Sequence, residues 1–153
     1  MKPIINLSPI AEGVNYSISS ADYLVTNAEE ARAVLGSQES NPLVLAKLLQ
    51  ERGAKNVIVT LGSSGVLGID QFGSDYQVEP QAIKVENTIG AGDTFLAIFA
   101  ASLNAGKDFR EALEIANYAA AIVCTKAESF LASKDMEKIS KKFNLQVLDS
   151  KVN

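Results

Sequence analysis

The sequence predicts an α/β fold in which helices cover both faces of a mainly parallel sheet. Two patterns point to it. Short β-branched segments alternate with longer segments whose apolar residues recur at helical spacing, and glycine, proline or asparagine stands between them. With 153 residues, 47% of them hydrophobic and 21% charged, the chain also has the size and composition of one globular domain. We therefore expect residues 1–153 to form a single α/β domain.

The first third of the chain predicts two strands and two helices. Pro3–Asn6 and Asp22–Thr26 are short, apolar and bounded by turn-forming residues, as buried strands are. A helix follows the second strand directly, because Asn27 can cap its start and Gly36 can end it. The second helix, Pro42–Arg52, has proline in its first turn, where the missing N–H does no harm.

The remainder predicts a hairpin and three helices. Val57–Thr60 and Val66–Ile69 are β-branched strands joined by the turn GSSG, and an extended segment follows them as far as Pro80. The first helix beyond this segment is apolar on nearly every face, which predicts that it is buried. The three helices are expected over Asp93–Gly106, Asp108–Lys126 and Ser133–Phe143.

Composition narrows the classes of partner and chemistry. The net charge of −4, without a run of Lys or Arg, argues against nucleic acid and anionic membranes as partners. Because the chain has no histidine, His-ligated metals and histidine-based nucleophile activation are excluded. No stretch reads as a signal peptide or a membrane span. The single cysteine, Cys124, is expected to pack as a small core residue, and a reducing, cytoplasmic setting fits it best.

The stretch GAGD, Gly90 to Asp93, is the most informative candidate site. Its glycines permit positive φ and close approach, and they precede a helix whose first N–H groups have no partners within the helix. Partial positive charge collects there, so phosphate is the usual occupant. Asp93 would suit a base that takes a proton from a hydroxyl attacking phosphorus. The same four residues are equally typical of an ordinary glycine turn whose aspartate only favours the helix start.

Two other phosphate-binding motifs do not fit. In a dinucleotide-binding fingerprint a third glycine would stand where the chain has Phe95, which would obstruct close packing of helix and strand. This disfavours a dinucleotide oxidoreductase. A Walker-type loop is excluded because Gly106 and Lys107 are followed by Asp108 rather than by Ser or Thr.

Three motifs together, TNAEEA, VTLGSSG and NTIGAGDTF, resemble the C-terminal signatures of the ribokinase-like carbohydrate kinases of the phosphofructokinase B type. The resemblance begins at IINLSP and covers nearly the whole chain. It implies a three-layer α/β/α fold equivalent to the nucleotide-binding C-terminal half of a sugar kinase. The N-terminal strands, the β lid and the sugar-binding residues of such kinases have no counterpart in the sequence.

The resemblance also implies site residues. Asp93 matches the catalytic base, and Gly90, Ala91 and Gly92 match the anion hole for the transferred phosphoryl group. Other matched positions are Thr60, Gly62 and Gly65 at the ATP phosphates and ribose, Asn117 near the adenine, and Asn27 and Glu30, which organise Mg²⁺ and phosphate largely through water. Structural alternatives remain beside these roles: Asn27 with Glu30 makes a good helix start, GSSG a hairpin turn, and Asn117 an exposed helix residue.

Two positions depart from the family pattern. Asn87 stands where most relatives with a monovalent-cation site carry Asp. Because the anionic ligand is lost, Asn87 is only a weak candidate ligand for a monovalent cation, and activation by potassium loses support. Lys126 stands where many relatives carry Gly. Together with LNAGKDFREALEIANYAAAIV it resembles the heptose-phosphate kinase branch, while ribokinase and fructokinase relatives stay open.

The resemblance implies a kinase that uses ATP and Mg²⁺ to phosphorylate a sugar or sugar phosphate. The alternative is a non-catalytic nucleotide-binding or structural remnant of such a kinase. Half of a sheet should leave an exposed strand edge and apolar helix faces, so we expect a homodimer or a larger assembly.

Overall fold

The structure is a computed structural model, and it describes residues 2–11 and 15–145. Strands and helices within these residues follow the predicted alternation. The strands are β1 (Ile4–Asn6), β2 (Tyr23–Asn27), β3 (Asn56–Thr60), β4 (Val66–Ile69) and β5 (Asp75–Val78). The helices are α1 (Ala28–Leu35), α2 (Pro42–Glu51), α3 (Ala91–Asn104), α4 (Phe109–Cys124) and α5 (Ser133–Phe143). A 3₁₀ turn, Gly62–Ser64, joins β3 to β4.

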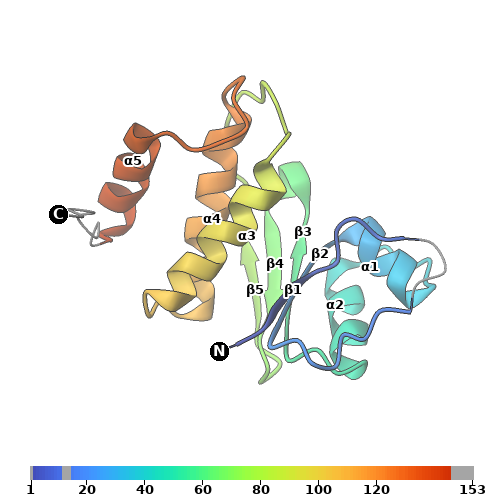
Figure 1. Ribbon diagram of the computed structural model, residues 1–153. Helices are drawn as coiled ribbons and strands as arrows, with labels where there is room; N and C mark the ends of the chain where they lie inside the picture. The colour runs from blue at the N-terminus through green and yellow to red at the C-terminus, as the bar shows by residue number, and fades with distance from the viewer. Residues whose placement is uncertain (1, 12–14, 146–153) are drawn as a thin grey trace.

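The elements form three layers. The sheet has the order β1-β2-β3-β4-β5, with α1 and α2 on one face and α3 and α4 on the other, as Figure 1 shows. The fifth helix, α5, packs on α4 outside these layers, with Ile139 buried against Ile115 and Ala119. The expected α/β/α arrangement is confirmed. No helix in the described part of the chain is long and apolar enough to cross a membrane.

The sheet is mixed rather than mainly parallel. Strands β1, β2 and β3 are parallel, whereas β4 and β5 each run antiparallel to the strand before them. The reason is the length of the connections, because parallel strands need a long crossover and the turn Gly62–Ser64 is short enough only for a hairpin. Asn27 is paired with Thr60, so β2 and β3 end at the same edge of the sheet.

Alternation along β2 and β3 builds a core on each face. Leu24 and Val57 face the cluster that contains α1 and α2, whereas Tyr23 and Ile58 face the cluster that contains α3 and α4. Successive residues of a strand point to opposite faces, so both faces of these central strands are apolar. On the second face the rings of Tyr23 and Phe99 meet edge to face, with centroids 5.6 Å apart.

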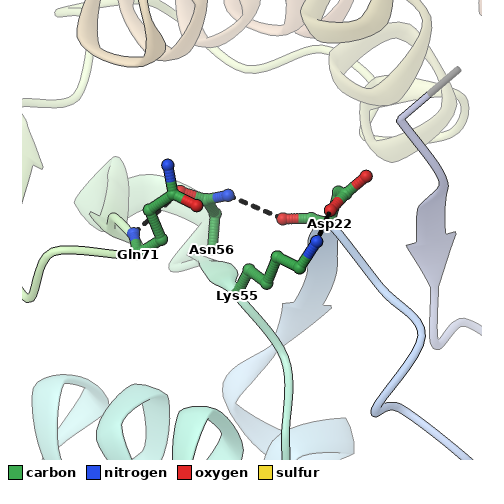
Figure 2. A network of polar contacts seen from close by, with 4 residues as sticks. All are labelled: Asp22, Lys55, Asn56 and Gln71. Carbon is green, nitrogen blue, oxygen red and sulfur yellow. Dashed lines mark hydrogen bonds and ion pairs between the residues drawn. The ribbon is translucent and has the colours of Figure 1, made fainter.

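A polar network fixes the start of β2 and β3, at the end opposite Asn27 and Thr60. Figure 2 shows it: the Asn56 side chain donates to the Asp22 carbonyl (2.7 Å) and accepts from the Gln71 N–H (2.9 Å). Lys55 and Asp22 form an ion pair beside it at 2.5 Å. These bonds hold two strand starts and the β4–β5 turn in register.

Two expectations about burial need correction. The helix α3 buries Phe95 and Phe99, but its outer face is exposed at Ala97 and Ala101, so it is not buried on every side. It also begins at Ala91, two residues earlier than expected. Cys124 is only partly buried, at the end of α4, and burial raises the pKa of its thiol.

Candidate active site

Three of the predicted site residues, Asn27, Glu30 and Thr60, lie at the end of the sheet where β2 and β3 finish. Asn27 is both the last residue of β2 and the cap of α1, and its partner Thr60 is the last residue of β3. Two loops extend beyond this end of the sheet in Figure 1: the pre-α3 loop, residues 79–90, and the post-α4 loop, residues 125–132. In α/β sheets, ligands bind outside the carboxyl ends of parallel strands.

The start of α1 is closed by its own side chains. Asn27 Oδ1 accepts the N–H of Glu30 at 2.9 Å, and Glu30 Oε2 accepts the N–H of Asn27 at 2.9 Å. The hydroxyl of Thr26 lies 3.4 Å from the same carboxylate oxygen. This is a complete capping box, so Asn27 and Glu30 do form the helix start that was named as the alternative to a role in ligand binding.

The capping box still leaves groups that suit magnesium. Glu30 Oε1 makes no hydrogen bond within residues 2–11 and 15–145 and is free to accept from a metal-bound water, while the Asn27 amide N–H₂, also without a partner there, could only donate to a water or phosphate oxygen. The same residues contain no cluster of three or more Asp, Glu, Cys or His side chains that could hold a metal ion directly. Magnesium keeps several waters and takes one or two carboxylates plus phosphate oxygens. The donor set therefore fits a hydrated Mg²⁺ held mostly by a nucleotide.

The two glycines of GSSG, Gly62 and Gly65, have different surroundings. Gly65 has φ +87°, and a Cβ there would lie 2.1 Å from the Val78 carbonyl oxygen, so packing against the end of β5 requires it. Gly62 has φ +56° and open space around it. The Thr60 hydroxyl donates to the Thr26 carbonyl at 3.3 Å, which joins the ends of β3 and β2. Gly62 is thus the member of the turn with room for a ligand.

The start of α3 is open. Gly90 is the N-cap at φ +82° and provides no side-chain hydrogen bond. The N–H of Ala91 reaches the Thr88 carbonyl at 3.3 Å, and that of Thr94 reaches Gly90 at 2.9 Å. Among the described residues, nothing accepts from the N–H of Gly92 or of Asp93. A Cβ on Gly92 would meet no atom within 4 Å, and the Asp93 side chain beside it is exposed.

Contacts distant in sequence hold this open start in place. A Cβ on Gly90 would lie 2.4 Å from the Ser129 carbonyl oxygen, so the post-α4 loop rests directly on the turn. Asn87 donates through Nδ2 to the Ala127 carbonyl at 3.0 Å. The N–H groups of Glu86 and Asn87 both donate to the Cys124 carbonyl, at 2.7 and 3.2 Å. The pre-α3 loop is therefore anchored to the end of α4.

A hollow of about 520 Å³ lies between the same two loops, lined by Lys84, Val85, Glu86 and Thr125. Sequence reasoning found none of these four residues, nor Ser129. Lys84 and Glu86 stand in a segment without a motif, and Thr125 and Ser129 join them only through tertiary contact. Their one signal in the sequence is their closeness to motif residues.

The predicted residues form three groups. Asn27, Glu30 and Thr60 lie together at the ends of β2 and β3, with Gly62 and Gly65 in the turn that follows Thr60, and Asn87 lies with Gly90 to Asp93 at the start of α3. Asn117 belongs to a third place, because its Nδ2 donates to the Glu79 carbonyl at 3.0 Å and ties α4 to the end of β5. Its expected position near an adenine stays a prediction.

The chain is similar in sequence to known carbohydrate kinases. The profile of the pfkB family carbohydrate kinases matches residues 4–135. The bifunctional protein HldE of Desulfatibacillum aliphaticivorans is 34% identical over 120 residues, which are 75% of this chain and 24% of that protein.

Two solved structures are similar in both fold and sequence. The ribokinase of Thermotoga maritima is 30% identical, with a TM-score of 0.80 over 90% of this chain and 48% of that one. The Arabidopsis thaliana ribokinase, solved with ribose and ATP, is 28% identical with a TM-score of 0.75, over 90% of this chain and 47% of that one. The chain thus spans less than half the length of these relatives.

Proposed function

The chain belongs to the pfkB family of carbohydrate kinases, and on that premise we propose that it forms the nucleotide-binding half of a sugar kinase. The complete site transfers the γ-phosphoryl group of ATP to a hydroxyl of a sugar or sugar phosphate. One observation carries the proposal: the N–H groups of Gly92 and Asp93 have no partner in the described chain, and the space in front of Gly92 is open. A phosphate oxygen would satisfy both groups.

The roles are those that the family resemblance implies, and the charges and the open helix start support them. The sugar hydroxyl oxygen forms a bond to the γ-phosphorus while the bond from phosphorus to the departing ADP oxygen breaks, and the hydroxyl proton passes to the Asp93 carboxylate. The free N–H groups at the start of α3 stabilise the negative charge on the transferred group. Bound Mg²⁺ would neutralise charge on the ATP phosphates, and Glu30 would hold it through a water.

The remaining nucleotide contacts are proposed from space and polarity. Gly62, in its open turn, would contact the phosphates or ribose. The hollow beside Lys84 and Thr125 has a volume suited to a small ligand and would take the adenine. Because Asn117 Nδ2 is already bonded to the Glu79 carbonyl, only its oxygen is left to contact a base.

We also propose self-association and a cytoplasmic setting. Within the described residues, β1 is paired only with β2 and so presents an open edge. Ile89 and Phe130 are 71% and 63% exposed, on the pre-α3 and post-α4 loops. A dimer would cover such groups, and sedimentation of a strictly monomeric species at micromolar concentration would contradict it. The lone, partly exposed Cys124 favours a reducing compartment.

Calorimetry of the purified chain with ATP, ADP and NAD, each with Mg²⁺, tests the proposed function. We expect ATP and ADP to bind and NAD to bind at least about tenfold more weakly, because only a free phosphate end can enter the turn at Gly92. A preference for NAD would indicate an oxidoreductase-type site. Binding of ATP without sugar phosphorylation in any assembly would favour the non-catalytic alternative.

A further inference from the structure

The side-chain amide of Asn87 lies between the two loops that surround the start of α3. Its Nδ2 donates to the Ala127 carbonyl at 3.0 Å and lies 3.5 Å from the Ser129 hydroxyl. Its Oδ1 accepts the N–H of Ile89 at 3.0 Å. The orientation of the amide follows from these partners, because the reverse orientation would place oxygen against oxygen and N–H₂ against N–H.

This orientation does not fit a monovalent cation. With a carboxylate at position 87, three oxygen-bearing groups would converge, since the Ala127 carbonyl and the Ser129 hydroxyl already lie there. Such a set suits a hard cation. The amide instead directs its N–H groups at those oxygens, so an approaching cation would meet the positive end of the amide dipole.

We propose that Asn87 is a positioning residue whose amide joins the pre-α3 and post-α4 loops directly, so that the start of α3 keeps its shape without a monovalent cation. The binding of phosphate at this start rests on the proposed function. The joining of the two loops by Asn87 is independent of that function.

The bridge that the Asn87 amide makes between the two loops affects the turn at Gly90 through Ser129. The Ser129 carbonyl lies against Gly90, the cap of α3, closely enough to exclude a Cβ there. Asn87 holds the loop that carries Ser129 and, through Ile89, the residue just before the cap. Losing the bridge would let the turn move before a ligand arrives, and a turn that must be ordered on binding binds more weakly.

Asn87→Asp tests the proposal, because it preserves shape and the bond from Ile89 but removes the two N–H donors. In tetramethylammonium chloride we expect backbone amides of residues 88–92 and 125–130 to exchange about tenfold faster with deuterium than in the wild type, as a lost hydrogen bond allows. In KCl of equal ionic strength the exchange should return towards the wild-type rate. The wild type should exchange alike in both salts.

Nucleotide affinity gives a second readout. The Kd of the variant for ATP with Mg²⁺ should be about tenfold weaker in tetramethylammonium chloride than in KCl, the equivalent of one hydrogen bond. The wild-type Kd should agree within about twofold between the salts. Rescue by potassium separates positioning from a general loss of stability, which no particular cation would repair.

Asn41→Asp is the matched control. Asn41 caps α2 and accepts the Leu43 N–H through Oδ1 at 2.9 Å, as Asn87 accepts that of Ile89, but its Nδ2 has no partner in the described chain. This variant should match the wild type in both salts. Potassium-dependent exchange in the wild type, or an Asn87→Asp protein that exchanges like the wild type without potassium, would overturn the proposal. If the wild type binds no ATP, the proposed function fails, but the deuterium-exchange measurement still decides whether Asn87 joins the two loops.

Discussion

The starts of α1 and α3 solve the same physical problem in opposite ways. Both helices expose N–H groups in their first turn, where positive charge collects. At α1 the side chain of Asn27 accepts one of these groups and Glu30 returns the bond. At α3 the cap is Gly90, without a side chain, and the N–H groups of Gly92 and Asp93 stay free. A side-chain cap stabilises a helix, and a glycine cap keeps its anion-binding end available.

The two starts also differ in what supports them. The bonds that close α1 join residues three apart in the sequence. The open start of α3 is held by residues about forty positions away, because Asn87 bonds to Ala127 and Ser129 rests on Gly90. An end that must stay free for a ligand has to be positioned by its neighbours. The following variants test this contrast, from the largest expected effect to the smallest.

Replacing the carboxylate at the open start should have the largest effect. In an assembly that phosphorylates a sugar, Asp93→Asn should lower turnover by about 100- to 10,000-fold, the usual contribution of a general base. Its affinity for ATP should change little, since the Asp93 side chain makes no hydrogen bond within the described chain and the substitution keeps the free backbone N–H. Rates of ADP release and calorimetry measure the two quantities. Unchanged turnover would remove Asp93 from the chemistry.

A pair of glycine variants separates local strain from long-range support. Gly36→Ala, at the end of α1, meets only the penalty of φ +62° and should lower the free energy of unfolding by about 1 kcal/mol. Gly90→Ala meets a similar penalty plus the Ser129 carbonyl, and should lower it by about 3 kcal/mol. Urea denaturation measures both. Equal losses would mean that the post-α4 loop does not press on the turn.

A third helix start combines local and distant support. Asp135, in the first turn of α5, accepts the N–H of Ala132 at 2.8 Å and pairs with Lys126 of the post-α4 loop. The hydrogen bond from Lys126 and that from Ala132 lower the pKa of Asp135 below its ordinary range, against the opposing effect of burial. Asp135→Asn should therefore lower the free energy of unfolding by about 2 kcal/mol at pH 7.

The effect of this variant should depend on pH in a defined direction. A carboxyl whose pKa is lower in the folded state stabilises the fold above its unfolded pKa, and this stabilisation is lost as the pH falls through the folded value. The difference between wild type and Asp135→Asn should thus be constant from pH 7 to about pH 5 and disappear in stronger acid. A difference that grows in acid would contradict the ion pair.

An effect as small as that of Gly36→Ala is expected at the closed start. Asn27→Ala should lower the free energy of unfolding by about 1 kcal/mol, because the N–H of Glu30 loses its acceptor. Asn27→Asp keeps the acceptor and should be nearly neutral. Thermal melting measures both variants. If Asn27→Ala cost nothing in stability, the capping box would not be what retains asparagine at this position.

The sequence could predict those features that depend on residues close together in the chain. The cap of α1 depends on residues three apart, so the pattern Asn-x-x-Glu predicted it. The hairpin between β3 and β4 was likewise predicted from GSSG and its flanking strands. The motif at Gly90 predicted a glycine turn before a helix, but placed the start of α3 two residues late, because glycine and aspartate are poor helix formers.

Features that need the assembled fold were beyond the sequence. The bonds of Asn87 and the contact of Ser129 with Gly90 join segments that only folding brings together. The hollow at Lys84 has the same origin. The outer face of α3 was predicted to be buried because it is apolar, but Ala97 and Ala101 are small enough to lie at the surface. The mixed sheet combines a predicted hairpin with an added strand, β5, whose sequence was recognised only as extended.

The most direct test of the open helix start is calorimetric titration of ATP with Mg²⁺ into the wild type, Gly92→Val and Ala97→Val. Both substitutions add a β-branched side chain to an exposed position of α3, but only the first fills the space in front of the free N–H groups. We predict that the wild type and Ala97→Val bind alike, and that Gly92→Val weakens binding by about 100-fold or more, the equivalent of two hydrogen bonds to a charged group. Equal affinity in all three proteins would show that the start of α3 does not hold the phosphate.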